Sequence, residues 1–188
     1  MANLQQRRSR ITRLLHLLLA IAIVTQLALS LGMEPPRRGL AGDQLFELHE
    51  KAGLASLALL TLFWIWSVVR TGETRLSMLL PWFSTMRRQA FFRDLGAHVR
   101  ALRNKQVLLT EEKPFASGVH GLGLLIATLM AATGSVGYFV PGMDFLLEVH
   151  ETAAPLMWAY LVGHAGIAIL HQLSGDALLT RMFSLGKR

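Results

Sequence analysis

Residues 148–172 read EVHETAAPLMWAYLVGHAGIAILHQ, and this stretch decides the fold. It is long and apolar enough to cross a bilayer as one helix, which needs about 20 mostly apolar residues. It also carries His150, His164 and His171, at spacings of 14 and 7 residues. At about 100° per residue, these spacings place the three imidazoles on one stripe of the helix. Because histidine is costly inside a membrane, the stripe is a candidate functional site.

The composition predicts a membrane protein with a single domain over residues 1–188. Apolar residues make up 52% of the chain and charged residues only 16%, which is typical of a membrane protein. The absence of cysteine excludes disulfides, thiolate catalysis, iron–sulfur clusters and haem attached through a C-x-x-C-H motif. The net charge of +7 is not a nucleic-acid footprint, since the basic residues are segregated into particular connections.

Four apolar runs predict an all-α membrane protein, a bundle of four transmembrane helices. The first run, from Ile11 to Gly32, has an alternative reading as a cleaved signal peptide with a site at Ala28–Ser30. That run is longer than the 7–15 apolar residues usual for a signal, so we favour a retained helix. The predicted spans are about residues 12–32, 46–70, 115–139 and 148–172.

The connection over residues 71–114 is long and strongly basic. Within it, apolar residues recur at helical spacing and several arginines lie off that face, which predicts an amphipathic helix on the cytoplasmic membrane surface. A solvated basic loop is the alternative. The apolar positions are Phe91 or Phe92, Leu95, Val99 and Leu102, and the arginines are Arg93, Arg100 and Arg103.

The distribution of basic residues predicts the orientation. Of the 19 Lys and Arg residues, 16 lie in the amino-terminal segment, in the tail or in the long connection counted from Arg70. The positive-inside rule then places both termini and the 71–114 connection in the cytoplasm of a bacterial inner membrane.

This orientation gives each histidine a depth. His49 and His150 share the outer, periplasmic level, whereas His16 and His164 share the inner level. His150 and His164 are 14 residues apart, which is about 21 Å along a helix axis. Two pairs of histidines stacked across a bilayer are what two haem b groups require as axial ligands. A small residue follows one turn after each proposed ligand, which would leave room for a macrocycle: Ala20, Gly53, Ala154 and Ala168.

Four further residues have more than one interpretation each. His120 and His171 fall at the cytoplasmic boundary, where they are interfacial packing residues, part of a quinone or proton-handling site, or an alternative inner ligand. Glu50 and Glu151 could either lie beside the outer haem or accept protons from quinol. Alternatively, they only reflect the preference of acidic residues for helix amino termini. His98 lies in the basic connection, and we expect no special role for it.

A zinc protease and a cation transporter fit the sequence poorly. His49-Glu50 begins like H-E-x-x-H, but position 53 is glycine, so the second histidine of that motif is absent. A cation transporter would need carboxylates within the bilayer. Glu50, Glu148 and Glu151 lie only at the predicted periplasmic edge.

The chain resembles the prokaryotic cytochrome b561 family, which groups with the cytochrome b subunits of nickel–iron hydrogenases and formate dehydrogenases. The resemblance covers nearly the whole chain and implies two haem b groups, with His49 pairing with His150 and His16 with His164. It departs from simple members in its longer, more basic connection and in the single histidine of the third helix. The segments that carry it are Leu15–Leu17, Leu48-His49, Gly118–Gly123, Val149–Thr152, Gly163-His164 and Leu170-His171.

The sequence therefore predicts transmembrane electron transfer between the quinone pool and a redox partner in the periplasm or the membrane. Whether the chain is itself an enzyme, and whether it forms a homodimer, stay open. One alternative is a stand-alone oxidoreductase that acts on a small diffusible species such as superoxide at the periplasmic haem. A second is a non-redox haem or metal carrier, or a membrane anchor.

Overall fold

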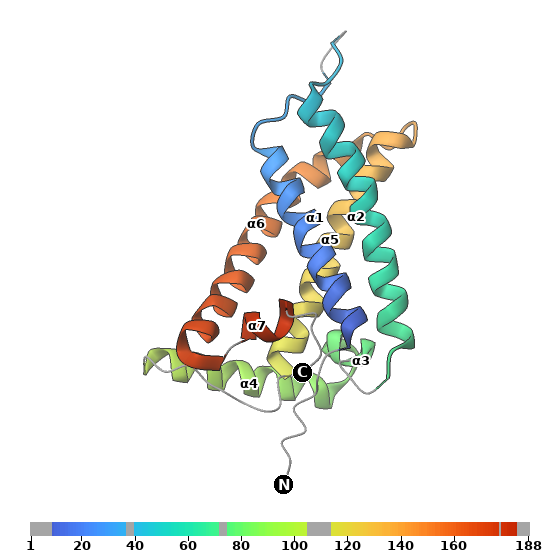
Figure 1. Ribbon diagram of the computed structural model, residues 1–188. Helices are drawn as coiled ribbons and strands as arrows, with labels where there is room; N and C mark the ends of the chain where they lie inside the picture. The colour runs from blue at the N-terminus through green and yellow to red at the C-terminus, as the bar shows by residue number, and fades with distance from the viewer. Residues whose placement is uncertain (1–8, 37–39, 72–74, 105–113, 177, 184–188) are drawn as a thin grey trace.

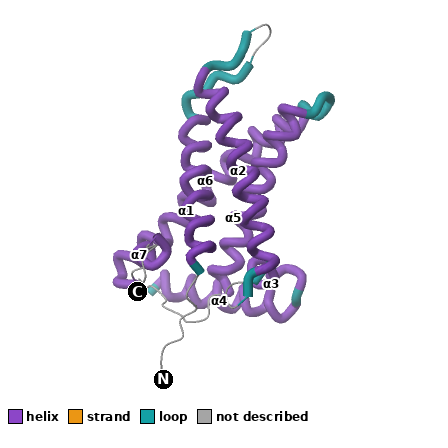
Figure 2. Tube along the Cα trace, turned by 45° about the vertical axis from the view of Figure 1, so that its right-hand side comes forward, coloured by secondary structure: helices purple, strands orange, loops and turns teal. Residues whose placement is uncertain are grey.

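Four long helices form the body of the protein in the computed structural model, which describes residues 9–36, 40–71, 75–104, 114–176 and 178–183. Each is long and apolar enough to cross a membrane, judged by length and composition. Along the bundle α1 packs against α2, α2 against α5 and α5 against α6 (Figures 1 and 2). The predicted four-helix membrane bundle is confirmed, with ends within three residues of the predicted ones. The helices are α1 Arg10–Ser30, α2 Gln44–Val69, α5 Pro114–Phe139 and α6 Phe145–His171.

Short polar side chains set where the helices start. Ser9 caps α1 by accepting a hydrogen bond from the Thr12 amide at 3.1 Å. The Asp43 carboxylate accepts from the Phe46 amide at 2.8 Å and caps α2. Both contacts satisfy amides that lack a partner within the first turn of a helix. These caps explain why α1 and α2 each begin two residues before the predicted start.

The long connection contains the predicted helix and two shorter elements that the sequence did not predict. They are α3 (Leu76–Leu79) and the 3₁₀ turn η1 (Pro81–Phe83), and the predicted helix is α4 (Thr85–Arg103). Figure 1 shows α4 lying across one end of the bundle, here called the α4 end; the opposite end is the far end.

Two contacts fix α4 to the start of α5. The Phe91 ring fills the notch at Gly118, where an added Cβ would lie 2.6 Å from the ring. The Asp94 carboxylate accepts a hydrogen bond from the Phe115 amide at 3.0 Å. Phe91, one of the two alternatives for the first position of the predicted apolar face, is buried against the bundle, whereas Phe92 and Val99 are 55% and 43% exposed.

Two more elements that the sequence did not predict follow α6. The chain continues through the turn η2 (Gln172–Asp176) into a short helix, α7 (Leu178–Phe183). Gly175 has φ 89°, a left-handed conformation that favours glycine and reverses the chain. The Gln172 side-chain oxygen accepts from the Leu179 amide at 3.0 Å. Contacts of α7 with α1 and α6 close the α4 end of the bundle.

Candidate functional site

Two histidines meet near the far end of the bundle, one from α2 and one from α6. The ring centroids of this far pair, His49 and His150, lie 6.2 Å apart with the ring planes at 85°. The Nδ1 atom of His150 lies 2.8 Å from the Met130 carbonyl oxygen on α5. A carbonyl only accepts, so Nδ1 must carry the proton and donate it. This leaves the Nε2 lone pair of His150 free to bind a metal.

His49, the second residue of the far pair, is held in place by α1. The Gln26 side-chain amide donates to the His49 carbonyl oxygen at 2.9 Å. Gln26 also occupies the space beside Gly53, where an added Cβ would lie 2.8 Å from the Gln26 nitrogen. The space that the sequence assigned to a macrocycle at Gly53 is therefore filled by a glutamine. The His49 Nδ1 and Gln26 Oε1 atoms are buried, and neither makes a hydrogen bond within the described part of the chain.

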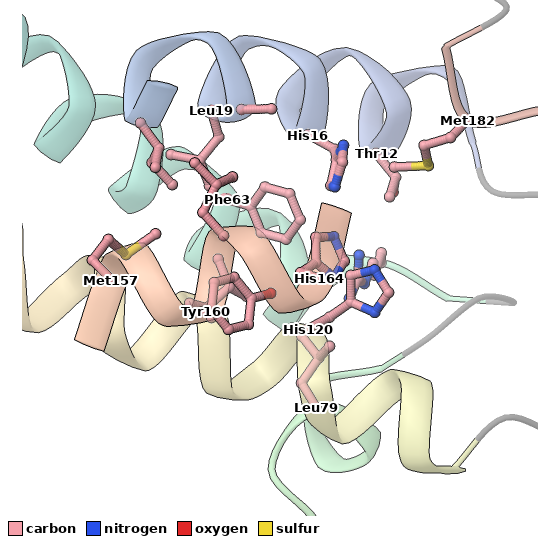
Figure 3. Close-up of a pocket in the computed structure, with 16 residues that line it drawn as sticks. Thr12, His16, Leu19, Phe63, Leu79, His120, Met157, Tyr160, His164 and Met182 are labelled. Atoms are coloured by element: carbon pink, nitrogen blue, oxygen red, sulfur yellow. The ribbon is translucent and has the colours of Figure 1, made fainter. Parts of the chain in front are cut away.

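Three histidines meet near the α4 end, in what we call the three-histidine cluster (His16, His120 and His164). Their ligand nitrogens all lie within 4.8 Å of one another. The ring centroids are 6.3 Å apart for His16 and His164, 6.3 Å for His16 and His120, and 5.0 Å for His120 and His164. Figure 3 shows the three imidazoles converging from α1, α5 and α6 on one pocket. The sequence placed His120 at this boundary, and the structure brings it into the cluster.

The cluster is packed by an aromatic ring and by small residues. Tyr160, one turn before His164 on α6, stacks on its imidazole with centroids 5.4 Å apart and planes at 8°. Tyr160 occupies the notch at Gly123, because an added Cβ there would overlap the phenol. By contrast, nothing lies within 4 Å of the Cβ positions that Gly163 and Gly166 lack. At about 100° per residue these two glycines lie on other sides of α6 than His164, so this open space is not beside its imidazole.

These separations can be compared with haem ligation. An imidazole nitrogen lies about 2 Å from the metal that it binds and about 1.1 Å from the centroid of its own ring. Each ring centroid is therefore about 3.1 Å from the iron, and two imidazoles on opposite sides of one iron have centroids about 6.2 Å apart. The far pair fits this value, and so does His16 with either partner in the cluster. The 5.0 Å between His120 and His164 is too short.

Three convergent imidazoles also resemble a zinc site, which is commonly built from three protein ligands and a water. The far pair offers only two imidazoles, which suits an axial pair better than a closed zinc site. Because geometry alone allows zinc at the cluster, similarity to known proteins is needed to decide between the two.

The remaining candidate residues lie outside the two groups of histidines. His171 is the last residue of α6 and is half-buried, seven residues beyond His164. Glu50 is half-buried on α2, and Glu151 is exposed on α6. His98 contacts its own helix, with Nδ1 2.9 Å from the Asp94 carbonyl oxygen.

Sequence reasoning missed three residues around these sites, namely Gln26, Arg70 and Tyr160. Gln26 could have been found, because with Thr25 it is one of the few polar residues inside the first span. Arg70 was read only as part of the basic connection, but it is 5% exposed and lines the pocket of the cluster. Tyr160 lies one turn from His164 and carried no separate signal.

Comparison with known families settles the class of cofactor. The family described as prokaryotic cytochrome b561 matches residues 7–185, almost the entire chain. No curated protein and no solved structure is similar enough to count as a match. Haem b is the cofactor of this family, and the separations of the two imidazole pairs are suited to it. The chain therefore belongs to the prokaryotic cytochrome b561 family, membrane proteins that transfer electrons through haem.

Proposed function

We propose that the bundle holds two haem b groups and passes electrons between them across the membrane. His49 and His150 would be the axial ligands of one group, called the far haem. His16 and His164 would hold the other, called the cluster haem. The observation that carries the proposal is the presence of imidazole pairs 6.2 and 6.3 Å apart at the two ends of one bundle. When bound, haem supplies a one-electron redox couple, and the protein sets ligation, spacing and dielectric.

The residues around the far pair would fix its ligation. The Met130 carbonyl holds the proton of His150 on Nδ1, so that Nε2 faces the iron. Thr133, with its hydroxyl 3.5 Å from the same Nδ1, supports this orientation. Gln26 fixes the α2 backbone at His49 from the neighbouring helix.

The cluster contains one imidazole more than an axial pair needs. We assign His16 and His164 to the iron and His120 to a neighbouring quinone, as a donor or acceptor of the quinol proton. His120 Nδ1 donates to the Ala116 carbonyl oxygen at 2.6 Å, which fixes the tautomer and the ring orientation of this imidazole. The quinone would then lie at the α4 end, which the distribution of basic residues predicts to be cytoplasmic. The redox partner would then exchange electrons with the far haem.

Vesicles can test electron transfer across the membrane. We would trap ferricyanide inside vesicles that hold the purified protein and add dithionite outside. Because neither ion crosses a bilayer readily, wild type should reduce the trapped ferricyanide faster than His164→Ala does. Protein-free vesicles measure the leak. The proposal fails if both haems are reduced by dithionite but the ferricyanide disappears no faster than in protein-free vesicles.

A glycine beside the far pair gives a prediction that touches no ligand. In Gly134→Ala, the added Cβ would lie 2.9 Å from Nδ1 and 3.0 Å from Cε1 of His150. We expect it to push this imidazole aside and weaken binding of the far haem by about 1–3 kcal/mol, as overpacking does. The measurement is haem retained per chain after dilution in detergent.

Gly96→Ala is the matched control. Its added Cβ would lie 3.9 Å from the nearest atom, Nη1 of Arg100, which is an ordinary contact distance. The cluster haem should stay in both variants. Equal haem retention in Gly134→Ala and Gly96→Ala would contradict this role of Gly134.

A further inference from the structure

The short helix α7 lies over the pocket of the three-histidine cluster (Figure 1). Its Phe183 ring lies against the His16 imidazole, with ring centroids 6.1 Å apart and ring planes at 49°. Met182 lines the pocket itself (Figure 3). Leu179, Met182 and Phe183 are three and four residues apart, so they share one face of the helix. Thr180 lies off that face and is exposed. The apolar face of α7 is therefore turned toward the cluster.

The turn that precedes α7 fixes this helix against the bundle. Gly175 has φ 89°, which favours glycine, and nothing lies within 4 Å of the Cβ position that it lacks. The Gln172 side-chain oxygen accepts from the Leu179 amide at 3.0 Å, and the Gln172 side-chain nitrogen donates to the Thr180 hydroxyl at 3.3 Å. A helix of six residues is not stable on its own. The position of α7 therefore depends on this turn and on packing against the bundle.

The Phe183 ring is the part of α7 that separates the cluster from the surroundings. The side chain is 42% exposed, whereas His16 is half-buried. The ring therefore covers one side of the imidazole while its own outer side stays exposed. Because α7 contacts both α1 and α6, it bridges the two helices that carry His16 and His164. This position suits a cover that keeps water out of the pocket at the α4 end.

We propose that α7 covers the cluster haem, and that Phe183 is a positioning residue that holds the His16 imidazole and keeps water from it. This inference rests on the proposed function, because it needs a haem held by His16 and His164. Ferric haem carries one positive charge more than ferrous haem, and exclusion of water disfavours the more highly charged form. The cover should therefore raise the reduction potential of the cluster haem.

The first test compares purified holoprotein of wild type, Phe183→Ala, Phe183→Leu and Phe92→Ala. Phe92 provides the matched control, because it is also partly exposed at the α4 end but packs on the Phe91 ring and lies outside the pocket. The cluster haem is recognised as the component that His164→Ala lacks. At the potential where this haem is half reduced in wild type, we expect a ferric-to-ferrous ratio at least about threefold higher in Phe183→Ala, a shift of about 28 mV. Phe183→Leu should recover part of the shift, and Phe92→Ala should match wild type.

A second readout detects the entry of water directly. Pulsed electron paramagnetic resonance of the ferric protein in D₂O reports exchangeable deuterons close to the iron. Phe183→Ala should show a stronger deuteron signal at the cluster haem than wild type, whereas Phe92→Ala should not. An effect of Phe183 on the potential from a distance would leave this signal unchanged.

Gly175→Ala releases α7 without touching the pocket, because alanine rarely adopts the backbone conformation of this turn. Gly142→Ala is its matched control. Gly142 has φ 81° and equally open space around its missing Cβ, but it lies in the turn between α5 and α6 at the far end. We expect Gly175→Ala to change the cluster haem as Phe183→Ala does, and Gly142→Ala to leave that haem as in wild type. If Phe183→Ala does not accumulate, the deuteron signal of Gly175→Ala decides.

The outcomes against this inference differ from those against the proposed function. If wild type contains both haems but the deuteron signal of Phe183→Ala matches that of Phe92→Ala, α7 does not keep water from the cluster haem. This holds even if the potential changes, and the haem assignment would stand. If wild type lacks a haem at His16 and His164, the proposed function itself fails.

Discussion

Replacing His150 with alanine is expected to remove the far haem and to leave the cluster haem in place. The His150 imidazole is 6.2 Å from that of His49, and its Nδ1 proton is held by the Met130 carbonyl, so Nε2 is set to bind iron. Without it, one axial ligand is missing and the macrocycle has lost half of its attachment. Haem b should fall from about two per chain to about one, as measured by the pyridine haemochrome and protein concentration.

The matched control for this substitution is His98→Ala. His98 contacts Asp94 on α4 and Phe115 at the start of α5 rather than either group of histidines, so this variant should keep both haems. His49→Ala should lose the same haem as His150→Ala, with the same spectrum for the haem that remains. If His49→Ala and His150→Ala removed different haems, the far pair would not be an axial pair.

In the three-histidine cluster, His164→Ala is expected to abolish binding of the cluster haem, whereas His120→Ala should keep it. Both rings are 6.3 Å from that of His16, so distance alone does not choose between them. A stacked tyrosine fixes the ring plane of His164. His120 lies beside Leu79 and the closely packed start of α5, where Gly121 abuts the Leu79 backbone. This close packing leaves less room for a macrocycle beside His120.

The two variants are distinguished by haem content and by reaction with quinol. His164→Ala should contain about one haem per chain, and His120→Ala should contain about two. In His120→Ala, quinol should reduce the haems about tenfold more slowly than in wild type, because a proton acceptor is lost. The opposite pattern, in which His120→Ala loses the haem and His164→Ala keeps it, would make His120 the ligand and reverse the assignment.

Depth along a helix could be predicted from the sequence, because each residue advances about 1.5 Å along a straight helix. Depth alone therefore pairs His49 with His150 and His16 with His164. Each of these pairs does lie together in the structure. The apolar runs gave the four spans for a similar reason, since the width of a bilayer fixes their length.

Rotation of each helix about its axis could not be predicted in the same way, since it depends on packing against neighbours. His120 points into the cluster because α5 turns that face toward α1 and α6, and nothing in the third span marked the face. Gln26 fills the space beside Gly53 for the same reason. Val99 is exposed although it follows the apolar repeat, because only one side of α4 packs against the bundle. The six residues of α7 are too few to show a helical period.

The most direct measurement of the central claim is the haem content of the purified wild-type chain, combined with a redox titration. We expect about two haem b per chain, with a reduced-minus-oxidised spectrum that resolves two components of different midpoint potential. One haem per chain would contradict the assignment of a haem to each end of the bundle. A preparation with no haem but with zinc bound at the three-histidine cluster would contradict the account as a whole.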